Sequence, residues 1–229
     1  ALGGQPIDMT YTAYLDLAKA PYISEIKADV VADKALCEKF GVHLDQFVEG
    51  NVPVKISYQE NKNGDETVAI DADVSPVVVK FSPFEYRKPE GKAGNATCNV
   101  LIQKGEVRHI KDLKLSIDKG GAASGNIYFG KVGNINDVKS GKFSSFTMAG
   151  ANNFALDFTQ TAPNVFDIAI KGKQLDGRPF LGGKAAGANS KDKGTPTAVN
   201  AVVDVTQSKT GNDVDQLLIK PTLSLKTNA

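Results

Sequence analysis

The 229-residue chain has no tryptophan and only two cysteines, Cys37 and Cys98. Two cysteines so far apart in sequence form neither a metal-binding motif nor a framework of disulfides, although one bond between them is compatible with an oxidising compartment. We prefer to interpret them as two small apolar side chains. Aromatic residues make up only 7% of the chain. This scarcity argues against the aromatic platforms of a carbohydrate-acting enzyme.

Charge of one sign is not in excess, because 27 Lys and Arg face 26 Asp and Glu and leave a net charge of +1. Nucleic-acid-binding proteins usually gather a basic surplus on one face, so we expect no nucleic-acid partner. No apolar run approaches the roughly 20 residues that span a bilayer. The chain begins at Ala1 without an initiator methionine or a signal peptide. We therefore expect a processed form or a piece of a longer protein, with any membrane anchor outside this sequence.

Motifs of enzymes and metal sites are scarce. His43 and His109 have no partner at the spacing of metal ligands, and no glycine-rich segment carries the Lys-Ser/Thr of a phosphate loop. Asp71 and Asp73 are two residues apart, a pair that could bind calcium or serve a glycosidase. The solvated face of a strand is the simpler interpretation. We expect no catalytic residue, no metal ligand and no cofactor, so the protein is not expected to be an enzyme.

The pattern that the chain does contain is an alternation of apolar and polar residues. Val68, Ile70, Ala72 and Val74 alternate with Thr67, Ala69, Asp71 and Asp73, which is the period of a strand with one buried face. Similar segments follow one another along most of the chain, separated by turns rich in Gly, Asn and Pro. About a dozen strands are predicted in this way.

One helix interrupts the strands. Asp33 is a suitable N-cap, the helix is expected over residues 33–40, and Gly41 ends it. Leu36 and Phe40 are spaced i, i+4, so both would dock the helix onto the sheet.

The stretch 70–94 predicts a corner of the sheet: a strand, a turn at Ser75-Pro76, a short apolar strand and an exposed bend rich in Pro and Gly. Residues 182–197 contain hardly a large apolar side chain and are expected to form a flexible loop. Residues 198–229 resume the alternation and are expected to continue the same sheet. The fold class is therefore all-β, a long, twisted, mostly antiparallel sheet curled into a groove, with one short helix. A β-sandwich is the alternative.

Three motifs over residues 50–181 resemble a known family. They are Gly50-Asn-Val-Pro-Val54; Asp73-Val-Ser-Pro76 followed by Lys88-Pro-Glu-Gly-Lys92; and Gly172-Lys-Gln-Leu-Asp-Gly-Arg-Pro-Phe-Leu181. Their order and spacing resemble the AsmA-like domain of the AsmA/TamB/YhdP family of bacterial envelope proteins. We therefore assign residues 1–181 as an AsmA-like segment.

The resemblance implies a periplasmic segment of a large Gram-negative envelope protein, anchored to the inner membrane by a segment absent from this sequence. It also implies a non-enzymatic role, in which a groove carries phospholipid between the inner and outer membranes or maintains the outer membrane. The expected partners are phospholipid acyl chains and the remaining segments of the full-length chain. Each buried CH₂ of an acyl chain contributes about 0.8 kcal/mol, so such a groove needs no charged pocket.

The candidate lining of the groove is the apolar set of the alternating segments. Its members are Val68, Ile70, Val100, Ile102, Leu113, Leu115, Ile117, Ile127, Phe129, Phe154, Leu156, Phe158, Phe166, Ile168 and Ile170. Each of them would equally suit an ordinary core. The competing hypothesis is therefore a closed β-sandwich that acts as a scaffold or adhesion module without a ligand.

Overall fold

The structure is a computed structural model, and it describes residues 7–39, 47–81, 84, 86–130, 138–148, 150, 152–163, 165–177 and 198–209. Within these ranges the protein is nearly all β, with one short helix, α1 (Lys34–Lys39). The strands form an 11-stranded sheet and a 3-stranded sheet. The sequence prediction of a mostly antiparallel β fold with one short helix is confirmed.

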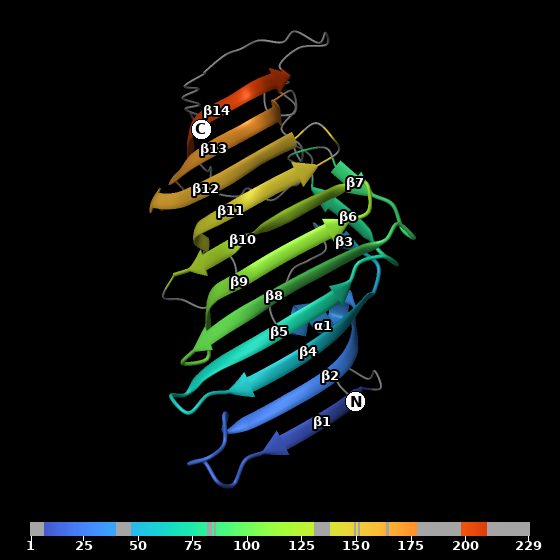
Figure 1. Cartoon of the computed structure of the whole chain (residues 1–229), viewed down its shortest axis with the longest axis vertical. Helices are drawn as coiled ribbons and strands as arrows, with labels where there is room; N and C mark the ends of the chain where they lie inside the picture. The colour runs from blue at the N-terminus through green and yellow to red at the C-terminus, as the bar shows by residue number, and fades with distance from the viewer. Residues whose placement is uncertain are drawn as a thin grey trace.

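The large sheet is an open, twisted array of strands stacked along the long axis of the molecule (Figure 1). In spatial order its strands are β1 (Asp8–Ala13), β2 (Ser24–Ala32), β4 (Val52–Glu60), β5 (Asp65–Asp73), β8 (Gly94–Gln103), β9 (Glu106–Ile117), β10 (Gly121–Phe129), β11 (Val138–Met148), β12 (Asn152–Ala162), β13 (Val165–Asp176) and β14 (Ala198–Lys209). Neighbours are antiparallel except β13 and β14, which run parallel. Because β1 and β14 lie at opposite ends of this order, the sheet does not close on itself.

The small sheet contains β3 (Val48–Glu49), β6 (Val78–Phe81) and β7 (Tyr86–Lys88), in that order. Glu49 on β3 forms ion pairs with Lys80 on β6 and Arg87 on β7, so one carboxylate connects all three strands. Figure 1 draws this sheet and α1 behind the large sheet. Among the described residues they are the elements outside the large sheet.

The helix begins as the sequence predicts. The carboxylate of Asp33 accepts the backbone N–H of Leu36 at 2.7 Å, which is the hydrogen bond of an N-cap. Leu36 is buried and anchors the helix, whereas Phe40 lies outside the described residues.

The stretch 70–94 is the corner around which the two sheets join. The chain leaves the large sheet after β5, turns at Ser75-Pro76, forms β6 and β7, and returns as β8, which pairs with β5. Lys88 is fully buried at this corner, and its Nζ donates hydrogen bonds to the carbonyl oxygens of Ser75, Val77 and Pro89. The bend was expected to be exposed; at Lys88 that expectation is wrong, because three carbonyls solvate the ammonium inside the fold.

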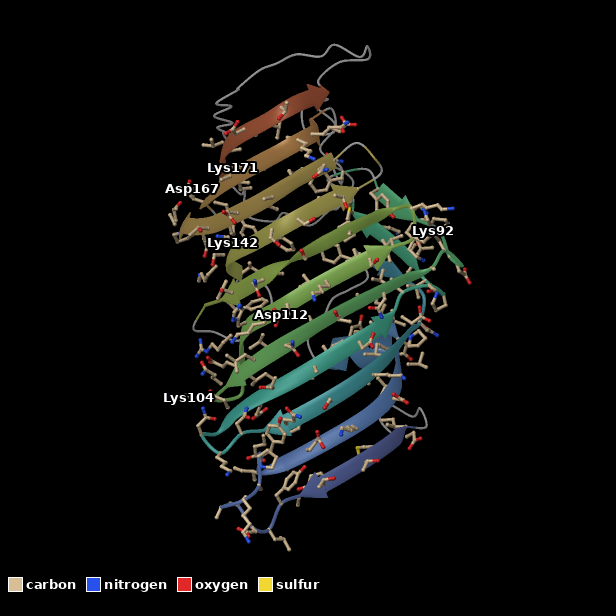
Figure 2. The ribbon with its side chains drawn as sticks, in the orientation of Figure 1. Lys92, Lys104, Asp112, Lys142, Asp167 and Lys171 are labelled. Carbon is tan, nitrogen blue, oxygen red and sulfur yellow. The ribbon has the colours of Figure 1, made fainter. Side chains whose placement is uncertain are left out.

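The two faces of the large sheet differ in polarity. Paired residues of neighbouring strands share a face, so the register assigns each side chain to one side. One side, which we call the polar face, carries charged side chains that Figure 2 labels: Asp112, Lys142, Asp167 and Lys171. The other side, which we call the apolar face, carries the even-numbered apolar residues of β2, β4, β5, β8, β12 and β13 and their partners.

The core lies where the small sheet covers the apolar face, at one end of the strands from β4 to β14. One cluster packs Val77 and Val79 of the small sheet and its turn against Val52 and Val74. A second cluster packs Tyr86 against apolar residues from β9 to β14, among them Phe146 and Phe154, whose rings stack at 5.0 Å. The core therefore lies under the small sheet rather than along the whole apolar face.

Two predicted segments extend beyond the described residues. β14 pairs with β13 in the large sheet over 198–209, while residues 210–229 and the predicted loop at 182–197 lie outside the described residues. The sequence pattern predicts two short strands, at 132–139 and at 143–148. The structure has one strand over 138–148, β11, and residues 132–137 are not described.

Candidate functional site: the uncovered part of the apolar face

A row of side chains crosses the apolar face from one edge of the large sheet to the other. Each strand contributes one residue, and successive residues are register partners: Tyr11, Ile26, Tyr58, Val68, Val100, Ile110, Ile127, Gly141, Phe158, Ile168 and Ala201. We call this set the central row. Neighbouring strands lie about 4.8 Å apart, so the row extends roughly 50 Å. It contains no charged side chain.

The structure places all fifteen candidate lining residues on this apolar face, but it divides them into two groups. Leu115, Ile117, Phe154, Leu156 and Ile170 belong to or pack against the core under the small sheet. The remaining ten are half-buried and belong to neither core cluster: Val68, Ile70, Val100, Ile102, Leu113, Ile127, Phe129, Phe158, Phe166 and Ile168. The second group therefore forms the part of the predicted lining that lies outside the core clusters.

Glycines shape the floor of the apolar face between β10 and β13. Gly125, Gly141 and Gly172 are register partners of Phe143, Phe158 and Phe154. At each of these glycines an added Cβ would lie 2.7 Å or less from the partner phenylalanine. At Gly125 and Gly141 the close atoms belong to the rings of Phe143 and Phe158, which occupy the space over the glycines, whereas at Gly172 they are the Cα and Cβ of Phe154.

The hairpin end of β4 and β5 supplies polar groups beside the central row. Glu60 and Glu66 are register partners on the apolar face, and Glu60 accepts a hydrogen bond from the Ser24 hydroxyl at 3.0 Å. Burial raises the pKa of the Tyr58 hydroxyl, and the carboxylates of Glu66 and Glu60 raise it further. The phenol therefore stays neutral next to these two acids, and the apolar face has a polar rim at this end.

The acidic pair Asp71 and Asp73 lies on the polar face, away from this site. Asp71 accepts the Asn95 amide at 2.6 Å and pairs in register with Lys55. Asp73 accepts the backbone N–H of Ser75 at 2.8 Å, and hydrogen bonds from Ser75 lower the pKa of its carboxyl. Both carboxylates thus have structural partners, and the described residues contain no group of three side chains suited to a metal ion.

Sequence reasoning missed part of the apolar face. Ile110 was not included among the lining residues because the register of β9 shifts near Asp112, which has a φ of 52°. At this irregularity the apolar residues of β9 change from odd to even numbers. The backbone N–H of Asp112 donates a hydrogen bond to the Asn126 side chain at 3.0 Å. Ile26 and Tyr58 lie in segments whose alternation predicts strands, but their place in the central row depends on the strand order, which alternation alone does not give.

His109 and the cysteines do not contribute to the central row. His109 stacks on Tyr128 on the polar face, with ring centroids 3.9 Å apart. Cys37 and Cys98 are both free and half-buried, so the disulfide considered from the sequence is not formed.

No helix in the described ranges is long and apolar enough to cross a membrane.

Comparisons with known proteins found no match: no protein-family model, no curated protein and no solved structure is significantly similar to this chain. The AsmA-like resemblance therefore depends on the sequence motifs alone.

Proposed function

We propose that this protein is a non-enzymatic, AsmA-like groove segment that carries phospholipid acyl chains along its apolar face. In this proposal it works in the Gram-negative periplasm, as part of a larger protein held at the inner membrane, in phospholipid transit or outer-membrane maintenance. Its other partners are the remaining segments of that protein.

The observation that supports the proposal is the central row outside the core. Soluble proteins rarely leave large apolar patches uncovered, and such patches commonly mark sites for a partner or an apolar ligand. Val68, Val100, Ile110 and Ile127 are half-buried, are successive register partners on β5, β8, β9 and β10, and belong to neither core cluster. A row of this length, free of charge, suits a flexible hydrocarbon chain better than a compact polar ligand.

A scaffold or adhesion module without a ligand is the competing function. It was expected to take the form of a closed sandwich, with the apolar residues packed between two full sheets. Here three short strands pack over one end of the strands of an 11-stranded sheet, from β4 to β14. This arrangement favours the groove over the sandwich as the basis of function.

The test is lipid occupancy of the purified protein, measured by native mass spectrometry and by extraction of co-purified lipid. The informative variant is Val100→Asp, because its carboxylate would lie in the centre of the row, where burial against a hydrocarbon chain is costly. Leu101→Asp is the matched control: Leu101 is the next residue on β8, is also half-buried, and points to the polar face.

We expect the parent protein and Leu101→Asp to retain acyl lipid and Val100→Asp to lose most of it while staying folded. Vesicles containing a fluorescent phospholipid provide a second measurement, the transfer of label to the protein. A parent protein that neither co-purifies with lipid nor accepts it from vesicles would refute the proposal and favour the scaffold.

A further inference from the structure

The edge strand β1 leaves apolar side chains uncovered. Its six residues are all exposed, and it has a strand neighbour on one side only among the described residues. Met9 and Tyr11 project from it onto the apolar face and are 58% and 60% exposed. Leu15 and Leu17 follow directly. These four residues are half of the eight large apolar side chains that are exposed in the described part of the chain.

Natural sheets usually protect an edge with lysine, proline, a bulge or a covering segment, because unpaired backbone groups invite another strand. β1 has none of the first three: its sequence is Asp-Met-Thr-Tyr-Thr-Ala, and its pairing with β2 is regular throughout. The opposite edge differs. On β14, Val203 and Val205 already pack in the core, and the exposed large apolar side chain among its described residues is Val202 on the polar face.

The sequence of β1 is complementary to itself in the antiparallel direction. If Thr10 lies opposite Thr10 of a second copy, Met9 faces Tyr11 on the apolar face twice, and Asp8 faces Thr12 on the polar face twice. Thioether–aromatic and threonine–threonine pairs across strands are favourable, and no like charges meet. Such an interface is isologous, so it closes after two copies instead of growing into a fibre.

We propose that β1 is a dimerisation edge, through which two copies of this chain join their large sheets antiparallel. The dimer covers Met9 and Tyr11 and joins the apolar face of one copy to that of its partner, because each central row ends at Tyr11. This proposal is independent of what the apolar face binds.

Mass measurement over a wide range of concentration tests the assembly. Light scattering after size exclusion should give a dimer for the parent and a monomer for Met9→Lys/Tyr11→Lys, whose exposed side chains are not needed by the fold. Val202→Lys is the control on the opposite edge and should remain dimeric. A parent that is monomeric at every concentration, or an assembly that Val202→Lys disrupts, overturns the proposal.

Cysteine cross-linking tests the register. Residues directly opposite in an antiparallel pair have Cα atoms about 4.5–5.5 Å apart, within the range that a disulfide spans. In a background with Cys37→Ser and Cys98→Ala, Thr10→Cys should form covalent dimers on mild oxidation. Val31→Cys, at a position on β2 that is also exposed, should not. Cross-linking of Thr10→Cys no faster than Val31→Cys means that β1 does not pair with itself.

Discussion

The Nζ of Lys88 lies 2.7 Å from the carbonyl oxygen of Val77, in the interior of the corner that joins the two sheets. The same ammonium also bonds the carbonyls of Ser75 and Pro89, and its residue has no exposed surface. Burial lowers the pKa of this amine. One side chain thus connects the beginning and the end of the segment between β5 and β8, which contains β6 and β7 of the small sheet.

The first prediction concerns this lysine. Lys88→Met removes the donor of three hydrogen bonds, one of them to the buried carbonyl of Val77, so the free energy of unfolding should fall by about 3 kcal/mol. Arg87→Met is the control, because Arg87 is largely exposed and loses only a surface ion pair with Glu49, worth less than about 1 kcal/mol. Urea denaturation measures both. Equal losses would mean that the buried bonds do not hold the corner.

The sequence predicted the turn at Ser75-Pro76 and the strands on both sides of it, but not the role of Lys88. Alternation and turn residues are local signals, so they locate strands and turns. A lysine in a Lys-Pro-x-Gly bend is indistinguishable from a solvated one until the carbonyls of residues 75 and 77 are brought to it. For the same reason, alternation predicted that the lining residues share one face of the sheet. It did not predict which of them pack in the core under the small sheet.

The second prediction concerns Tyr86, whose buried hydroxyl has no hydrogen-bond partner among the described residues. Burial raises the pKa of this hydroxyl. Tyr86→Phe removes an unsatisfied polar group and keeps the ring in the core, so stability should rise by about 1 kcal/mol. The melting temperature measures the change. A clear loss of stability would show that the hydroxyl has a partner in solution.

The third prediction concerns the glycine floor. A Cβ at Gly141 would lie 2.3 Å and 2.5 Å from two ring carbons of Phe158. Since the backbone of Gly141 is not left-handed, the cost of Gly141→Ala is steric, and we expect a loss of about 1–3 kcal/mol. The double variant with Phe158→Ala tests the cause, because the penalty of Gly141→Ala should largely vanish when the ring is absent. Additive effects would contradict this packing.

The fourth prediction concerns pH. Burial, and then the Lys111 ammonium, lowers the pKa of His109 below the value of about 6.5 of an unfolded chain, while Asp112 opposes this. Below pH 6.5 the unfolded chain therefore binds a proton that the folded protein does not bind. The contribution of neutral His109 should be complete above pH 6.5 and decline as the pH falls toward the lowered pKa. The difference in unfolding free energy between the parent and His109→Gln isolates this term, and a difference independent of pH would refute it.

The last prediction compares two positions of the apolar face. Leu115 and Val100 are both half-buried, but Leu115 packs against both core clusters under the small sheet and Val100 belongs to neither. An aspartate at residue 115 would lie against the packed side chains of both clusters without a partner, at a cost of several kcal/mol, comparable with the whole stability of a domain. At residue 100 the carboxylate can reach water through the uncovered face. We therefore expect Leu115→Asp to unfold or fail to express and Val100→Asp to melt cooperatively, a few degrees below the parent. Equal loss of folding in both variants would mean that the face is covered at Val100 as well, which would remove the physical basis of the groove.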